Sequence, residues 1–519
     1  MSFTPIRNRV DSSFNVIVQS LLADDTLPFA DALTAEHIQQ AFDDDQVARH
    51  SEPAVASGTA PDRSDRTSKS DRTNKSERTK SDDDSEAHSD ATVYTRALTL
   101  WAMLSQALST GVHRSCVAAV QRIAVYAALR GVEVSSTNTG AYCRARARIS
   151  EPVVRGLAEG VAARSEASVP DEWKWFGFAP CLLDGSTHSM PDTEQNQAEY
   201  PQSRSQKPGL GFPVMRSVAL TSLQTGMVLA VALGPCVGKE TGETALARTL
   251  FDHLKPGSLV VADRYYAGWF MLALMQLLGI EFVTRLNQNR TADFNTGTRL
   301  GKGDHLAVWD KPPKPKWLDQ ATYDLFPAQL TVREVEVRVD TPGFRTKSLV
   351  AVTSLHEHTT YTSHAIAALY RCRWMIELHF RDIKTTMQLD ILRSKTPAAV
   401  RRELWTGILA YNLVRQSILQ SAVASNRPPH RLSFAAALQL LANTWLIAAL
   451  FCDDQPSSPP VSGRERMIAL RLLNGHSHCV GNRPDRVEPR AVKRRAAPIA
   501  ILTELRSCAR ERLISGPKV

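Results

Sequence analysis

One stretch of the sequence carries four side chains suited to work on a phosphodiester: an aromatic hydroxyl, a guanidinium, a carboxylate and an ammonium. They are Tyr370, Arg373, Glu377 and Lys384, at offsets of 0, 3, 7 and 14 residues. At about 100° per residue, a helix places these offsets within roughly 60° of arc, so one stripe carries all four. The carboxylate can bind a metal ion, and the cations can pair with phosphates. An ordinary exposed face with charge pairs is the alternative.

Two further residues of this expected helix need an interpretation of their own. Asp382 lies about 140° around the helix from Glu377, so it cannot share a metal with Glu377, and we expect it to be solvated. Trp374 lies beside the stripe, and it can either contact DNA or pack in the core.

Upstream, Asp184 and Asp263 each follow a short apolar run, 176–183 and 258–262, that we expect to be a strand. A carboxylate at a strand end projects from the sheet edge, where ligands commonly bind in α/β proteins. If the two strands are neighbours, both carboxylates point at one spot and Glu377 can complete it. Three such acids suit a pair of Mg²⁺ ions about 3.5–4 Å apart. For Asp184 alone, a turn former or helix N-cap is the alternative.

These motifs together resemble the DDE transposases of bacterial insertion sequences, in the subgroup with the Y-R-E-K signature (insertion-sequence family four). The residues that carry the resemblance are DGST from Asp184, ADR around Asp263, and Y-x2-R-x3-E-x6-K from Tyr370 to Lys384. The resemblance covers roughly residues 95 to 500. It implies an α/β fold with an RNase H-like mixed-sheet core, a β-rich insertion and helical N- and C-terminal regions. It also implies two Mg²⁺ ions, which Mn²⁺ can replace, on the three acids.

The same resemblance implies a DNA reaction. The enzyme would bind double-stranded DNA at the terminal inverted repeats as a homodimer, cut the ends, form and reopen a hairpin, and transfer the ends to target DNA. An aromatic side chain of the β insertion, Trp309 or Trp317, would stack on a flipped base. Inactive or domesticated DNA-binding descendants, and RNase H-like nucleases without strand transfer, are the alternatives. The expected DNA contacts are Tyr370, Arg373, Trp374, Arg381, Lys384, Arg264, Arg490, Lys493, Arg494 and Arg495.

The composition fits this class of protein. The chain has 519 residues, 43% of them hydrophobic and 22% charged, with a net charge of +9 that weakly favours a polyanionic partner. Its eight cysteines show no zinc-like spacing. No secretory signal is visible. The charge-free run from Leu432 to Cys452 is interrupted by polar residues, so we expect it to form a core helix and not to cross a membrane. We therefore expect a bacterial, nucleoid-associated cytoplasmic protein.

Shifts in composition and periodicity divide the chain into segments. We expect a small helical unit at 1–50, a disordered polar linker at 51–92, a helical DNA-binding region at 93–170, and the first part of the core at 171–286. A separate β insertion follows at 287–357. The second part of the core with the Glu377 helix comes at 358–400, then a helical region at 401–475 and a basic tail at 476–519.

Overall fold

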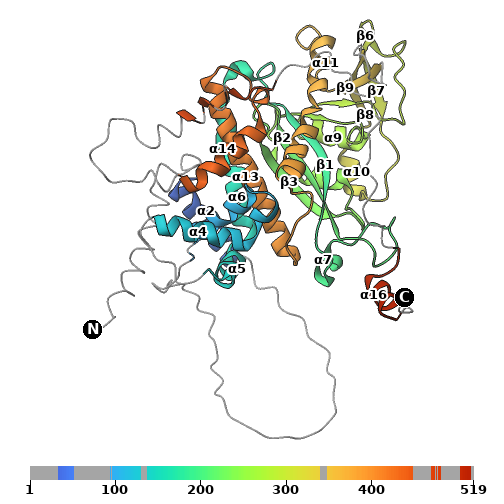
Figure 1. Ribbon diagram of the computed structural model, residues 1–519. Helices are drawn as coiled ribbons and strands as arrows, with labels where there is room; N and C mark the ends of the chain where they lie inside the picture. Colours follow the sequence, from blue (N-terminus) through green and yellow to red (C-terminus); the bar gives the residue numbers. More distant parts are fainter. Residues whose placement is uncertain are drawn as a thin grey trace, which may run out of the picture.

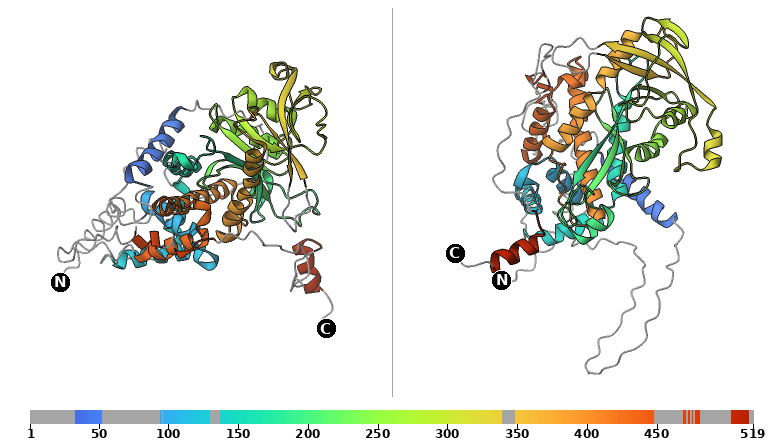
Figure 2. Two further views of the ribbon diagram at one scale, coloured as in Figure 1. Left: turned by 90° about the horizontal axis from the view of Figure 1, so that it is seen from above. Right: turned by 90° about the vertical axis from the view of Figure 1, so that its right-hand side faces the viewer.

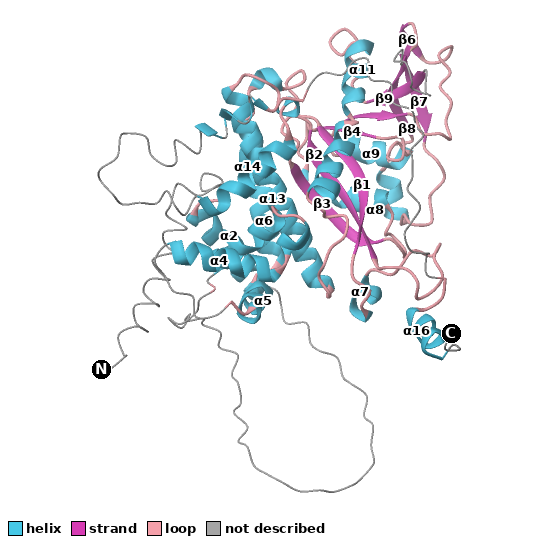
Figure 3. Cartoon of the chain, viewed as in Figure 1, coloured by secondary structure: helices cyan, strands magenta, loops and turns pink. Residues whose placement is uncertain are grey.

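A computed structural model describes residues 33–51, 94, 96–129, 137–338, 348–447, several positions between 469 and 480, and 503–515. Within these residues, a group of helices lies beside one long twisted sheet (Figures 1 and 3). The expected linker from residue 52 onward lies outside the described residues, as do Arg490, Lys493, Arg494 and Arg495.

The sheet has nine strands in the order β3-β2-β1-β4-β5-β9-β8-β7-β6. The first three pair antiparallel, whereas β4 and β5 run parallel to β1. This mixed arrangement, with helices on both faces, confirms the expected RNase H-like core. The strands are β1 Cys181–Ser189, β2 Val214–Ser222, β3 Val228–Pro235, β4 Leu259–Ala262 and β5 Glu281–Arg285.

The strands of the β insertion extend this sheet, so the expectation of a separate unit needs correction. β9 (Ser348–Thr353) pairs antiparallel with β5, and β8 (Gln329–Arg338), β7 (Asp304–Asp310) and β6 (Thr298–Gly301) follow. An open β5 edge would leave a row of unpaired N–H and C=O groups, which β9 satisfies. The insertion is therefore held by the core's own hydrogen-bond ladder.

Alternate residues of the central strands enter two different cores. Leu183 packs with α8 (Glu243–Thr249) and α9 (Trp269–Leu277) on one face, whereas Leu182 packs with α11 (Ser363–Cys372) and α12 (Met375–Arg381) on the other. Burial on both faces explains why these strands read as continuous apolar runs.

A third core joins the N-terminal helices to the long helix α13 (Pro397–Ala424). α13 packs against α6, and Figure 2 shows both beside the sheet. α6 begins after a cap in which Ser150 Oγ accepts a bond from the Val153 N–H. The helices on this side are α2 Ala35–Ser51, α3 Arg96–Ala107, η1 Gly111–Arg114, α4 Cys116–Leu129, α5 Thr139–Arg148, α6 Glu151–Ala167 and α14 Phe434–Ile447.

Of the expected core helix at Leu432–Cys452, the part from Phe434 to Ile447 is present as α14, with Phe434, Leu438 and Leu441 buried, and residues 448–452 lie outside the described part of the chain. None of the described helices has the length and apolar character needed to cross a membrane. The remaining elements are short: η2 Asp171–Trp173, α7 Glu194–Glu199, η3 Phe251–His253, α10 Gln320–Leu325, η4 Asp382–Thr386, η5 Pro429–Arg431 and α16 Arg506–Ser515.

Candidate active site

Asp184 and Asp263 lie on neighbouring parallel strands. In the β1–β4 register, Leu183 pairs with Ala262, so the two aspartates are the next residues of the two strands. The expectation that Asp184 ends its strand is wrong, because β1 continues through Gly185 to Ser189 by pairing with β2. Asp263 does follow directly after β4.

The environment of these acids is crowded with negative charge. Asp184 Oδ1 accepts a bond from the Gly185 N–H at 2.8 Å, and Asp263 Oδ1 accepts one from the Tyr265 N–H at 2.7 Å. Burial raises the pKa of Asp184 to about 6, and the charge of Asp263 adds to the rise while Arg373 opposes it. A cation bound here would relieve the repulsion between the carboxylates.

The expected single helix from Tyr370 to Lys384 is broken. α11 ends at Cys372, α12 begins at Met375, and a π-helical turn covers Asp382–Thr386. Even so, Arg373 and Glu377 remain on one side: Arg373 Nη2 lies 2.8 Å from Glu377 Oε1, and Nη1 lies 3.8 Å from Asp184 Oδ2. The guanidinium therefore connects the helical acid to the strand acid.

The residues at this site are suited to divalent metal ions. Within the described part of the chain, no three His, Cys, Asp or Glu side chains converge closely enough to hold a metal, and Arg373 holds the Glu377 carboxylate. The donors are nonetheless carboxylate oxygens, which Mg²⁺ prefers, and one of them, on Asp184, is buried beside the charge of Asp263.

Two neighbours of the site were not identified from the sequence. Glu243 lies so close to Gly185 that a Cβ there would be 2.7 Å from its Cδ. The hydroxyl of Tyr266 is buried without a hydrogen-bond partner among the described residues, and burial together with Glu243, Asp184 and Asp263 raises its pKa. The one available signal was Gly185, since a glycine inside a strand indicates close approach by another group.

Comparison with known proteins agrees with these motifs. A family model described as a transposase DDE domain matches residues 177–413, which include both aspartates and Glu377. The chain is also 28% identical over 362 residues to the transposase InsG of insertion sequence element IS4 from Escherichia coli K12, covering 68% of this chain and 76% of that protein. The chain thus carries a transposase DDE domain and is similar to the transposase of insertion sequence IS4. It is an enzyme that acts on DNA, and DDE transposases in general use divalent metal ions.

Other similarities are shorter or weaker. The transposase is 36% identical over 73 residues to the transposase of insertion sequence element IS421 from Escherichia coli, which covers 14% of this chain and 19% of that protein. A solved piggyBac transposase synaptic complex with hairpin DNA has 10% sequence identity and a TM-score of 0.36, covering 75% of this chain and 78% of that one. At that score the similarity supports no conclusion about hairpins.

The remaining residues of the Y-R-E-K helix differ in exposure. Tyr370 is only 7% exposed and packs in the core under α11, whereas Trp374 is 57% exposed, which excludes the core position for this side chain. Arg381 is exposed. Lys384 is half-buried in the π-helical turn, and its charge adds to the burial that lowers the pKa of His188 to about 4. Arg264 is exposed directly after Asp263.

Asp382 is buried, so the expectation of a solvated residue is wrong. Its Oδ2 accepts a hydrogen bond of 2.9 Å from Arg415 Nη2, on α13. The same nitrogen lies 2.8 Å from His379 Nδ1. The π-helical turn directs this carboxylate toward α13, where it pairs with the buried guanidinium of Arg415.

The two tryptophans of the β insertion have different surroundings. Trp309 is 5% exposed, and its indole N–H donates to Glu334 Oε1 at 3.0 Å, so it is a core residue. Trp317 is 45% exposed, and the guanidinium carbon of Arg248 lies 4.3 Å from the centre of its ring. Of the two, only Trp317 has a ring that a base could reach.

Proposed function

We propose that the transposase binds the terminal inverted repeats of its insertion sequence and catalyses metal-dependent cleavage and strand transfer of their ends. The observation that carries this proposal is the placement of Asp184 and Asp263 side by side, with Arg373 joining Asp184 to Glu377. In this proposal the three carboxylates hold the two Mg²⁺ ions. Bound metal ions would polarise the scissile phosphate and lower the pKa of the attacking water.

Arg373 has two alternative partners in this reaction. Its guanidinium is paired with Glu377 and lies near Asp184. A DNA phosphate offers the guanidinium a bidentate partner of its own, and this exchange frees both carboxylates. Arg373 thus couples the arrival of DNA to the availability of the acids.

The DNA would be held by the cations around these acids. Tyr370 and Lys384 would position phosphates near the scissile bond, with Trp374, Arg381 and Arg264 beside them on the surface. The basic arm with Arg490, Lys493, Arg494 and Arg495 would add phosphate contacts. Cleavage of each end would pass through a hairpin with Trp317 stacked on the flipped base, and a homodimer would pair the two ends.

The test is incubation of the protein with DNA that carries the gene's own flanking ends, with and without Mg²⁺. We expect the wild type to cut at the end boundary and to join the cut ends to target DNA, and Glu377→Gln to bind without cutting. Binding without cutting by both proteins would favour a DNA-binding descendant of a transposase. Cutting without joining would favour a nuclease.

A further inference from the structure

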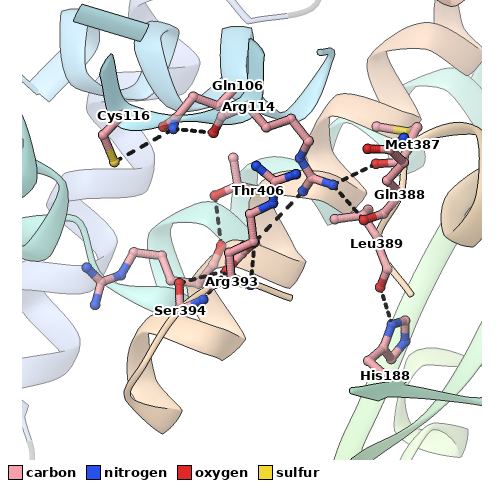
Figure 4. A network of polar contacts seen from close by, with 12 residues as sticks. Gln106, Arg114, Cys116, His188, Met387, Gln388, Leu389, Arg393, Ser394 and Thr406 are labelled. Carbon is pink, nitrogen blue, oxygen red and sulfur yellow. Dashed lines mark hydrogen bonds and ion pairs between the residues drawn. The ribbon is translucent and has the colours of Figure 1, made fainter. Parts of the chain in front are cut away.

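A cavity of about 710 Å³ lies between the N-terminal helices and the start of α13, away from the carboxylates. Helices α3, α4 and α5 form one wall, and the segment from Arg393 into α13 forms the other. Figure 4 shows part of this junction, where Gln106 and Arg114 lie opposite Arg393 and Ser394. Five cations and one carboxylate line what we term the junction pocket: Arg114, Arg146, Arg393, Lys395, Arg402 and Glu403.

The single carboxylate is already committed to other groups. Glu403 accepts bonds from the backbone N–H groups of Arg393 and Ser394, at 3.0 and 2.9 Å, and from the Ser394 hydroxyl at 2.7 Å. It also lies 3.8 Å from Arg114 Nη2. Of the cations that line the pocket, Arg114 therefore lies within ion-pair distance of Glu403, and the charge of Glu403 also acts on Arg146 from farther away.

The remaining cations have no carboxylate partner among the described residues. Arg146 Nη1 reaches only Cys116 Sγ, at 3.7 Å, and Arg402 Nη1 donates to the Arg146 carbonyl at 2.6 Å. The Nε of Arg402 is buried without a hydrogen-bond partner. Burial lowers the pKa of Arg402, and the charge of Arg146 adds to the effect. Two positively charged guanidinium groups therefore lie close together, and the Nε–H of Arg402 has no acceptor among the described residues.

The chain links this pocket to the catalytic centre. After the π-helical turn, the backbone runs beside the end of β1, where the Ser189 N–H donates to the Asp390 carbonyl at 2.9 Å. Asp184 and Ser189 are five residues apart on β1, which is about 16 Å. A DNA strand advances about 3.4 Å per nucleotide along the duplex axis, so about five nucleotides cover this length. Lys384 lies along this route, and Arg393 and Lys395 are exposed at the pocket mouth.

We propose that the junction pocket binds the phosphate backbone of the DNA end as a second holding site, several nucleotides from the scissile bond. This inference rests on the proposed function and deepens it, because it assigns part of the DNA path to the seam between the helical region and the core. The unpaired guanidinium groups of Arg146 and Arg402 would bind the phosphate oxygens, and Arg393 would do so at the mouth. A continuous phosphate backbone fits the run of cations better than a single small anion.

Arg146→Gln and Arg393→Gln test the pocket, and Arg144→Gln is the matched control. Arg144 is exposed on the same helix as Arg146 but is not part of the pocket lining. The affinity of each full-length protein for the end DNA is measured over a range of salt concentrations, after thermal melting has shown that it folds. Each lost phosphate contact should reduce the slope of log K against log salt by about 0.9. We expect this reduction in both pocket variants and an unchanged slope in Arg144→Gln.

The outcomes separate this proposal from the broader one. If the wild type binds the end DNA and the pocket variants keep its full slope, the pocket proposal is overturned while the proposed function stands. The pocket proposal is also overturned if inorganic phosphate raises the melting temperature of the wild type but not of the pocket variants while all slopes stay equal. That result would indicate a small-anion site. No binding of end DNA by the wild type would overturn both proposals.

Discussion

At the scale of single residues, the site buries the carboxylate of Asp184 at a cost in stability. Asp184 has a folded pKa of about 6 against an ordinary value of 3.8. The folded chain therefore holds this proton more tightly than the unfolded chain, and the free energy of unfolding falls as pH rises from about 4 to about 6. At pH 7 the loss amounts to about 3 kcal/mol at most, at 1.36 kcal/mol per pKa unit.

Asp184→Asn should remove this loss. We expect the variant to be more stable than the wild type by up to about 3 kcal/mol at pH 7, and by about half as much at pH 5. Urea unfolding at both pH values measures the difference. Asp192→Asn, on an exposed loop, is the control and should change little. A variant that is less stable than the wild type at pH 7 would contradict the assigned pKa.

At the scale of elements, the sequence predicts the strands well where periodicity alone decides them. The apolar run at 258–262 before Asp263 became β4. The predictions that failed concern residues whose partners lie far away in the sequence. β1 extends beyond Asp184 because β2 pairs with its polar half, and no local pattern reveals that pairing.

The Y-R-E-K helix shows the same limit. Its residue spacing brought Arg373 and Glu377 together, but periodicity assumed one regular helix and missed the break at Arg373–Trp374 and the π-helical turn. Periodicity also predicted that Asp382 is exposed to solvent, because the partner of Asp382, Arg415, lies 33 residues further along the chain. Glu243 was missed for a similar reason, since its contact with Gly185 is made between α8 and β1.

The ion pair between Asp382 and Arg415 should be necessary for the π-helical turn. The two side chains are 11% and 5% exposed, so Arg415→Leu leaves the buried carboxylate with only the longer contact of 3.8 Å to Arg381. We expect a loss of about 3–5 kcal/mol in the free energy of unfolding, measured with urea. Arg381→Leu, whose side chain is 62% exposed, should cost less than about 0.5 kcal/mol. Equal losses in the two variants would mean that the buried pair contributes no more to stability than the exposed Arg381 side chain.

At the scale of the whole molecule, α13 holds the helical region and the sheet together. Asn412 is fully buried: its Oδ1 accepts from the Val228 N–H at 2.9 Å, and its Nδ2 donates to the Val228 and Ala158 carbonyls at 2.9 and 3.0 Å. One amide thus joins β3, α6 and α13. The sequence identified the helices but not this seam, because the three groups lie far apart along the chain.

Asn412→Leu should leave the buried N–H and C=O of Val228 without their Asn412 partner, whereas the Ala158 carbonyl keeps its bond within α6. Each unsatisfied group costs about 1–3 kcal/mol, so we expect the free energy of unfolding to fall by at least about 2 kcal/mol. Gln420→Leu, at an exposed position of the same helix, is the control. Thermal and urea unfolding of the two variants give the comparison, and a loss no larger in Asn412→Leu than in Gln420→Leu would refute the role of this amide.

The central claim is that Asp184, Asp263 and Glu377 form one divalent-metal site. Mn²⁺ binding to the protein in complex with end DNA, followed by electron paramagnetic resonance, tests it without relying on cleavage. We expect Asp184→Asn, Asp263→Asn and Glu377→Gln each to weaken Mn²⁺ binding at least tenfold, about 1.4 kcal/mol. Glu194→Gln, at an exposed acid on α7, should bind Mn²⁺ like the wild type. Wild-type Mn²⁺ affinity in all three variants would contradict the claim.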